Sequence, residues 1–98
     1  MLIEVTAADI AAGERGMCRT CPVVLAVERA TGMNAIILTS WYCHIKAPDE
    51  GGWKNATKVR LPDNALEFIE RFDAGCEVAP FAFQLDFPSC AEPASEVQ

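Results

Sequence analysis

The chain has 98 residues, of which 51% are hydrophobic and 22% charged, and its formal net charge is -6. This composition is typical of a globular domain and unlike that of a disordered chain, and a domain of this length can bury enough surface to fold without disulfides. The negative charge argues against a general attraction to nucleic acid, and the longest apolar run is too short to cross a bilayer. We expect a single domain over residues 1–87, folding alone or with a copy of itself, and a flexible tail over residues 88–98.

A strand followed by a short helix is expected at the start of the chain. Residues 2–5 predict the strand and residues 7–12 the helix, because Thr6 can cap the helix while Asp9 reaches back to it. Gly13 is expected to end this helix. No basic and apolar leader precedes the strand and the cysteine count of five is odd, so we expect a cytoplasmic protein with reduced thiols.

A second helix is predicted to begin at Pro22, which is tolerated at the first helical position because its missing N–H would have no partner there. Cys21 then occupies the N-cap, and Gly32 is the expected stop after about Ala30. Residues 23–27 are apolar nearly all round, which indicates a helix packed on more than one side.

Alternation over residues 35–46 predicts one strand of a hairpin, and residues 53–61 predict the return strand after a turn at residues 48–52. One face of this hairpin is expected to lie on the core and the other to be basic and solvated. The expected core face carries Ile37, Thr39, Trp41, Cys43, Ile45, Trp53, Asn55, Thr57, Val59 and Leu61, and the expected solvated face carries Ser40, Tyr42, His44, Lys46, Lys54, Lys58 and Arg60.

A last helix is predicted from Pro62–Asp63 to Gly75, since Ala65, Phe68 and Phe72 recur at helical spacing. Residues 81–87 alternate strictly and predict a strand with one face on the core. The order of elements predicts an α+β two-layer sandwich, with helices on one face of a four-stranded, mostly antiparallel sheet. A ferredoxin-like βαββαβ arrangement fits that order.

Cys18 and Cys21 have the spacing of a pair of zinc ligands. A structural zinc needs two more ligands; Cys43 or the adjacent His44 could supply one, although neighbours in a strand point to opposite faces, and Cys76 is distant. A redox pair is favoured because Cys21 lies at a helix N-terminus, which lowers the pKa of a thiol. It is disfavoured because Cys18 and Cys21 both lie at or before the helix start, so that neither thiol is inside the helix. We expect both thiols to be structural, and Cys18, Cys21 and Cys43 to be the ligands if a metal is bound after all.

No complete catalytic constellation occurs in the sequence. His44 is the only histidine, and no recognisable motif places a serine, cysteine or aspartate beside it. Glu67 and Glu70 share one helical face, which is typical of the solvated side of an amphipathic helix. There is no phosphate-binding loop, metalloprotease motif or nucleophile elbow. We therefore expect a non-enzymatic protein that needs no cofactor.

Residues in both halves of the chain follow the pattern I-x-V-T-x-x-D-I, C-P-V-x-L-A, L-P, F-I-x-x-F-D-x-G and P-F-x-F. They are Ile3, Val5, Thr6, Asp9, Ile10, Gly13, Cys21, Pro22, Val23, Leu25, Ala26, Leu61, Pro62, Phe68, Ile69, Phe72, Asp73, Gly75 and residues 80–83. This pattern resembles a family of small uncharacterised proteins encoded by tailed bacteriophages, and it does not cover roughly residues 33–58. The resemblance implies expression inside an infected bacterial cell and assigns no reaction.

The predicted function is that of a phage-type accessory protein that binds a host protein. Inhibition of a component of antiviral defence is one form that this binding would take. Aromatic and arginine side chains are good interface anchors, and the hairpin carries both. Binding to nucleic acid is disfavoured by the net charge, and a thiol-redox or zinc protein is the alternative. The predicted partner-binding residues are Tyr42, His44, Lys46, Trp53, Lys54, Lys58 and Arg60.

Overall fold

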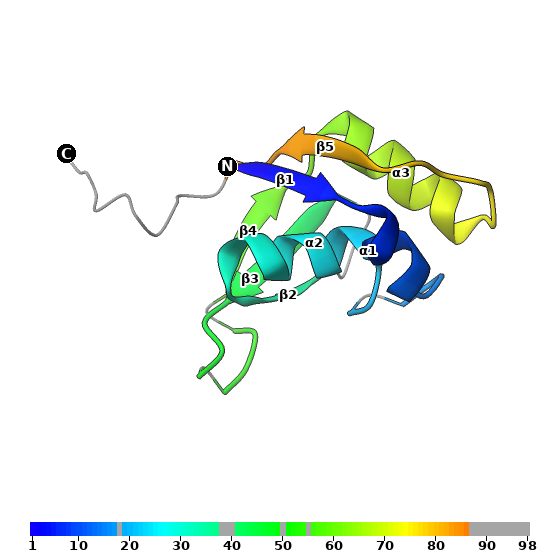
Figure 1. The fold of residues 1–98 in the computed structure, drawn as a ribbon. Helices are drawn as coiled ribbons and strands as arrows, with labels where there is room; N and C mark the ends of the chain where they lie inside the picture. The colour runs from blue at the N-terminus through cyan, green and yellow to red at the C-terminus, as the bar shows by residue number, and fades with distance from the viewer. Residues whose placement is uncertain (18, 38–40, 50, 55, 87–98) are drawn as a thin grey trace.

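The computed structural model describes residues 1–17, 19–37, 41–49, 51–54 and 56–86. Five strands and three helices occur in these segments (Figure 1). They are β1 (Leu2–Val5), α1 (Ala7–Ala12), α2 (Pro22–Thr31), β2 (Asn34–Ile36), β3 (Tyr42–Lys46), β4 (Thr57–Arg60), α3 (Asp63–Asp73) and β5 (Phe81–Gln84). The longest described helix, α3, has 11 residues, so no helix in these segments reaches the length of a membrane span.

The strands form two antiparallel sheets, so the expectation of one four-stranded sheet is wrong. β1 pairs with β5, and β2, β3 and β4 form a separate three-stranded sheet in that order. The number of strands also differs, because residues 35–46, predicted as one strand, include parts of β2 and β3, with Asn34 paired with Lys46. Without pairing between β1 and the β2–β3–β4 sheet, the described strands do not form a ferredoxin-like sheet. The α+β class and the antiparallel pairing are confirmed.

The β1–β5 pair joins the two ends of the described chain. Ile3 lies opposite Phe83 and Val5 opposite Phe81, and the backbone pairing continues where Leu85 N donates to Met1 O at 2.8 Å. The predicted alternation is confirmed for Phe83 and Leu85, which are both buried on the core. The β1 strand therefore owes its position to residues about 80 places later in the sequence.

The helix boundaries in the first third of the chain match the prediction from capping residues. Asp9 N donates to Thr6 Oγ1 at 3.2 Å, and Thr6 N donates back to Asp9 Oδ2 at 2.9 Å, which completes the predicted capping box of α1. Cys21 occupies the N-cap of α2 without a side-chain hydrogen bond there. Gly32 ends α2 with φ of 72°, a left-handed conformation that glycine adopts at little cost.

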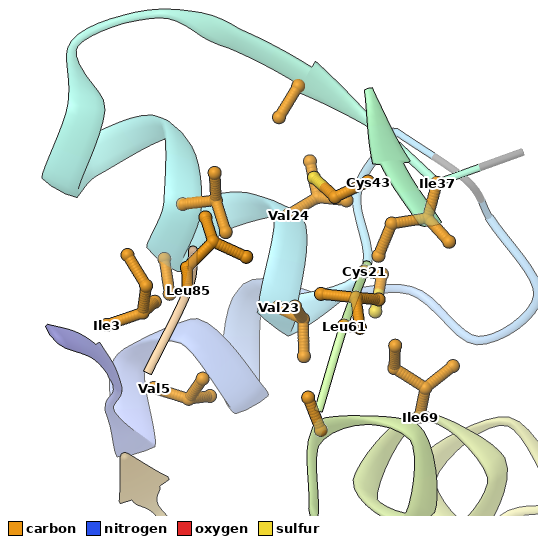
Figure 2. Packing of buried hydrophobic residues seen from close by; sticks show 14 of the residues in the cluster. Ile3, Val5, Cys21, Val23, Val24, Ile37, Cys43, Leu61, Ile69 and Leu85 are labelled. Atoms are coloured by element: carbon orange, nitrogen blue, oxygen red, sulfur yellow. The ribbon is translucent and has the colours of Figure 1, made fainter. Parts of the chain in front are cut away.

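Helix α2 is the centre of the core, as its all-round apolar sequence predicted. It packs against β1, β2 and α1, and Val23, Val24, Ala26 and Val27 are fully buried. Figure 2 shows Leu85 and Ile3 on one side of this helix and Cys43 and Ile37 on the other. The helix thus connects the two sheets through one continuous hydrophobic cluster.

Helix α3 lies beside the β1–β5 pair (Figure 1) and buries one stripe of side chains. Ala65, Phe68, Ile69 and Phe72 form this stripe, and the Phe68 ring stacks on Phe81 of β5 with 4.7 Å between centroids. The predicted start at Pro62–Asp63 is confirmed, and a left-handed Gly75 follows the helix.

Candidate functional site

The β3–β4 hairpin presents a set of cationic and aromatic side chains on the side opposite the core. Tyr42 lies opposite Arg60 and His44 opposite Lys58, while the intervening Cys43 and Val59 are buried. Because side chains alternate across a strand, this register places all four polar side chains on one surface. The alternation in the sequence predicted this arrangement.

The two β4 cations lie over the ring of Tyr42. Lys58 Nζ is 4.6 Å from the ring centroid and Arg60 Cζ is 5.9 Å from it. Attraction between a cation and the negative face of an aromatic ring contributes about 0.5–1 kcal/mol at exposed sites. These contacts therefore favour conformations in which both charges stay over the ring.

Two further cations lie over a second ring, that of Trp53. Lys46 Nζ is 5.1 Å from its centroid, and Arg19 Cζ is 5.9 Å from it. Arg19 belongs to the segment between α1 and α2, far from the hairpin in sequence, and reasoning from the sequence missed it. No periodic pattern could have found it, because only the tertiary fold brings this segment to the hairpin. We call Tyr42, Lys58, Arg60, Trp53, Lys46 and Arg19 the basic face.

Several predicted positions on this hairpin are wrong. Lys46 was expected in solvent, yet only 9% of it is exposed. Trp41 was expected on the core and is 59% exposed; it lies directly before β3. Thr57 was also expected on the core but is exposed at the start of β4.

Other predicted residues of the hairpin lie outside the strands or outside the described segments. Trp53 and Lys54 lie in the turn before β4, with Trp53 partly buried and Lys54 exposed. His44 is partly buried within β3. Three residues assigned to hairpin faces, Thr39, Ser40 and Asn55, are outside the described residues, and so are Cys18 and the predicted tail.

The thiols of Cys21 and Cys43 belong to the same hydrophobic cluster (Figure 2) and are buried. Burial raises the pKa of Cys21, and it raises the pKa of Cys43 to about 12, with further contributions from Cys21 and Glu28. A neutral thiol is a poor nucleophile and a poor metal ligand. Among the described residues, no three histidine, cysteine, aspartate or glutamate side chains are grouped to hold a metal ion. Cys21 and Cys43 therefore have the surroundings of packing residues.

We expect these two thiols to resist alkylation in the folded protein. At pH 8, iodoacetamide should modify Cys43 at least about a hundredfold more slowly than the exposed Cys76, because so little of the Cys43 thiol is ionised. Mass spectrometry of peptides from a time course measures each site separately. Unfolding in guanidinium is the control and should remove the difference. Equal native rates at Cys43 and Cys76 would contradict a packing role and support the thiol alternative.

The exposed side of α3 carries the two carboxylates noted in the sequence. Glu67 and Glu70 are both exposed, as expected for the solvated side of an amphipathic helix. They border an open hollow of about 440 Å³ that is also lined by Trp41, Leu66 and Ile69. The lining of this hollow includes no residue of the basic face and no histidine or cysteine.

Comparison of the chain with protein-family models, curated proteins and solved structures finds no match. The resemblance to bacteriophage proteins therefore stays a prediction, and function has to be argued from the surface of this fold.

Proposed function

We propose that this is a non-enzymatic binding protein that attaches to an acidic surface of another protein through the basic face. The observation that carries the proposal is the arrangement of four cations around two aromatic rings. Three of these cations, Arg19, Lys58 and Arg60, are exposed, and Lys46 is buried. The chain as a whole has a net charge of -6, so this face is opposite in sign to the average of the molecule. Such a local reversal of charge favours one orientation when an acidic partner approaches.

The rings give this face a property that scattered lysines lack. Long cationic side chains lose conformational freedom on binding, at a cost of about 0.5–1.5 kcal/mol for each side chain that becomes fixed. Lys58 and Arg60 already lie over Tyr42 in the free protein, so part of that ordering precedes binding. Tyrosine, tryptophan and arginine are also the residues that most often dominate the energy of protein interfaces.

An acidic protein is a better fit to this face than a nucleic acid. Proteins that bind single strands stack bases on open aromatic rings, whereas Tyr42 and Trp53 have cations of the same chain over them. In the setting that the bacteriophage resemblance implies, the proposed partner is a host protein. A component of antiviral defence is one such protein.

Reversing the charges on β4 is expected to weaken the complex at least tenfold. The test is capture of a stoichiometric partner from bacterial host lysate by the tagged chain and by Lys58→Glu/Arg60→Glu. The matched control is Arg71→Glu, which changes the net charge as much as the single variant Arg60→Glu does, at an exposed residue outside both the basic face and the predicted partner-binding residues. Circular dichroism should show the same fold for all these variants, because Lys58, Arg60 and Arg71 are exposed.

Two results would contradict the proposed function. If Lys58→Glu/Arg60→Glu captures the partner as well as the original chain does, the basic face is not the contact surface. If Arg71→Glu weakens capture as much as Arg60→Glu does, total charge and not this face determines binding.

A further inference from the structure

The β4 strand is the open edge of its sheet. Among the described strands it pairs only with β3, on one of its two sides. An edge strand leaves a row of backbone N–H and C=O groups that another extended chain can pair with. This edge adjoins the basic face, because Lys58 and Arg60 are half of the four-residue strand.

The pattern of hydrogen bonds between β3 and β4 determines which β4 residues have N–H and C=O groups that face the open edge. Leu61 N donates to Trp41 O at 2.8 Å, and these two residues continue the register of the β3–β4 pair. Bonded and unbonded residue pairs alternate along an antiparallel ladder. Arg60 and Lys58, one and three residues before Leu61, therefore occupy unbonded positions. Their N–H and C=O groups point away from β3, toward the open edge.

Lys58 and Arg60 thus offer backbone groups to the edge and cationic side chains to the basic face. A strand that pairs at this edge would place two residues, themselves two positions apart, directly opposite Lys58 and Arg60. Their side chains would lie on the basic face, with Cβ atoms about 5 Å from those of the two cations. Carboxylates at these two positions would form ion pairs with the ammonium and guanidinium groups that lie over the Tyr42 ring.

We infer that the partner of the basic face is an acidic segment in extended conformation, which adds to β4 as a further, antiparallel strand with carboxylates at alternate positions. This inference rests on the proposed function and specifies the conformation and the residue pattern of the bound segment. A second copy of the chain fits this edge poorly, since antiparallel β4–β4 pairing would oppose lysine and arginine to one another. A nucleic acid fits it poorly too, because it has no alternating amide N–H and C=O groups.

The test uses synthetic peptides and the full chain. The first probe is a ten-residue peptide of alternating threonine and glutamate, and the second has the same composition with its glutamates consecutive. Fluorescence anisotropy at low salt is expected to show at least about fivefold tighter binding of the alternating peptide, because only its carboxylates match the spacing of Lys58 and Arg60. The Lys58→Glu/Arg60→Glu and Arg60→Glu variants should lose or weaken this binding, and Arg71→Glu should keep it.

Backbone methylation of the alternating peptide separates edge pairing from simple charge attraction. Methylating the glutamate nitrogens removes the N–H groups that would donate to β4, and should weaken binding roughly tenfold. Methylating the threonine nitrogens instead leaves those donors in place and should have little effect. On binding of the unmodified peptide, hydrogen exchange at the amides of Lys58 and Arg60 should slow.

The possible failures of the two proposals differ. Equal binding by the two methylated peptides would overturn strand addition while leaving the proposed function intact. The same holds if neither peptide binds but capture of the host partner still depends on Lys58 and Arg60. Tighter binding of an oligothymidylate than of the alternating peptide would overturn both the extended acidic segment and the acidic protein partner.

Discussion

Replacing Arg29 by methionine is expected to lower the free energy of unfolding by about 2 kcal/mol, because the change leaves the Asp9 carboxylate without its main partner. Arg29 Nη1 and Nη2 donate to the two oxygens of Asp9 at 2.6 and 2.9 Å, and Nη2 also donates to Glu4 O at 2.8 Å. Only 6% of the Asp9 side chain is exposed, against 52% of Arg29. The ion pair thus connects α1, α2 and β1.

The half-exposed position of Arg29 keeps the expected loss below the 3–5 kcal/mol typical of a fully buried pair. Urea unfolding followed by circular dichroism measures the change in unfolding free energy. The matched control is Arg71→Met, at an exposed arginine in the last turn of α3, where we expect a change within about 0.5 kcal/mol. An equal effect of both substitutions would show that the ion pair with Asp9 contributes nothing particular.

The same ion pair predicts a dependence of stability on pH. The hydrogen bond from Arg29 lowers the pKa of Asp9 below 3.8, with further lowering by Thr6, while burial acts in the opposite direction. As the pH falls, the unfolded state therefore takes up this proton before the folded state does. The stabilisation is complete above about pH 4 and is lost as the pH falls through the lower pKa of the folded state. In Asp9→Asn, this part of the acid dependence should be absent.

The second large effect is expected for Gly13→Ala, with a loss of about 2–3 kcal/mol. Gly13 ends α1 and lies against Pro22, the first residue of α2; a Cβ added there would be 2.5 Å from Pro22 Cγ and 2.6 Å from Cδ. The proline ring is rigid and fully buried, so it has no room to withdraw. The two helices would have to move apart, and the packing of α2 would loosen.

The control for this substitution is Gly51→Ala, where no atom lies within 4 Å of the added carbon. There we expect a change close to zero, or a small gain because alanine restricts the unfolded chain. Thermal unfolding of both variants and of the original chain gives the comparison. If Gly13→Ala were as stable as Gly51→Ala, the close contact between α1 and Pro22 would be wrong.

Part of the candidate site could be found by reading the sequence. Alternation placed Tyr42, His44, Lys58 and Arg60 on one face, and the structure confirms that face because a strand has a fixed period of two. Alternation did not indicate that Lys46 is buried against Trp53 or that Arg19 lies over the same ring. Those contacts depend on the positions that a turn and a distant loop take in the folded chain.

Local structure could be predicted from residues that are near one another in the sequence. The capping box of α1, the proline at the start of α2, the left-handed Gly32 and the buried stripe of α3 are all confirmed, because each depends on residues within a few positions of one another. The pairing of the strands could not be predicted in this way. Residues 35–46 alternate as one strand would, and alternation looks the same in a single strand and in two strands that turn back on each other. The separation into two sheets, and with it the open edge of β4, follows from contacts between residues far apart in the chain.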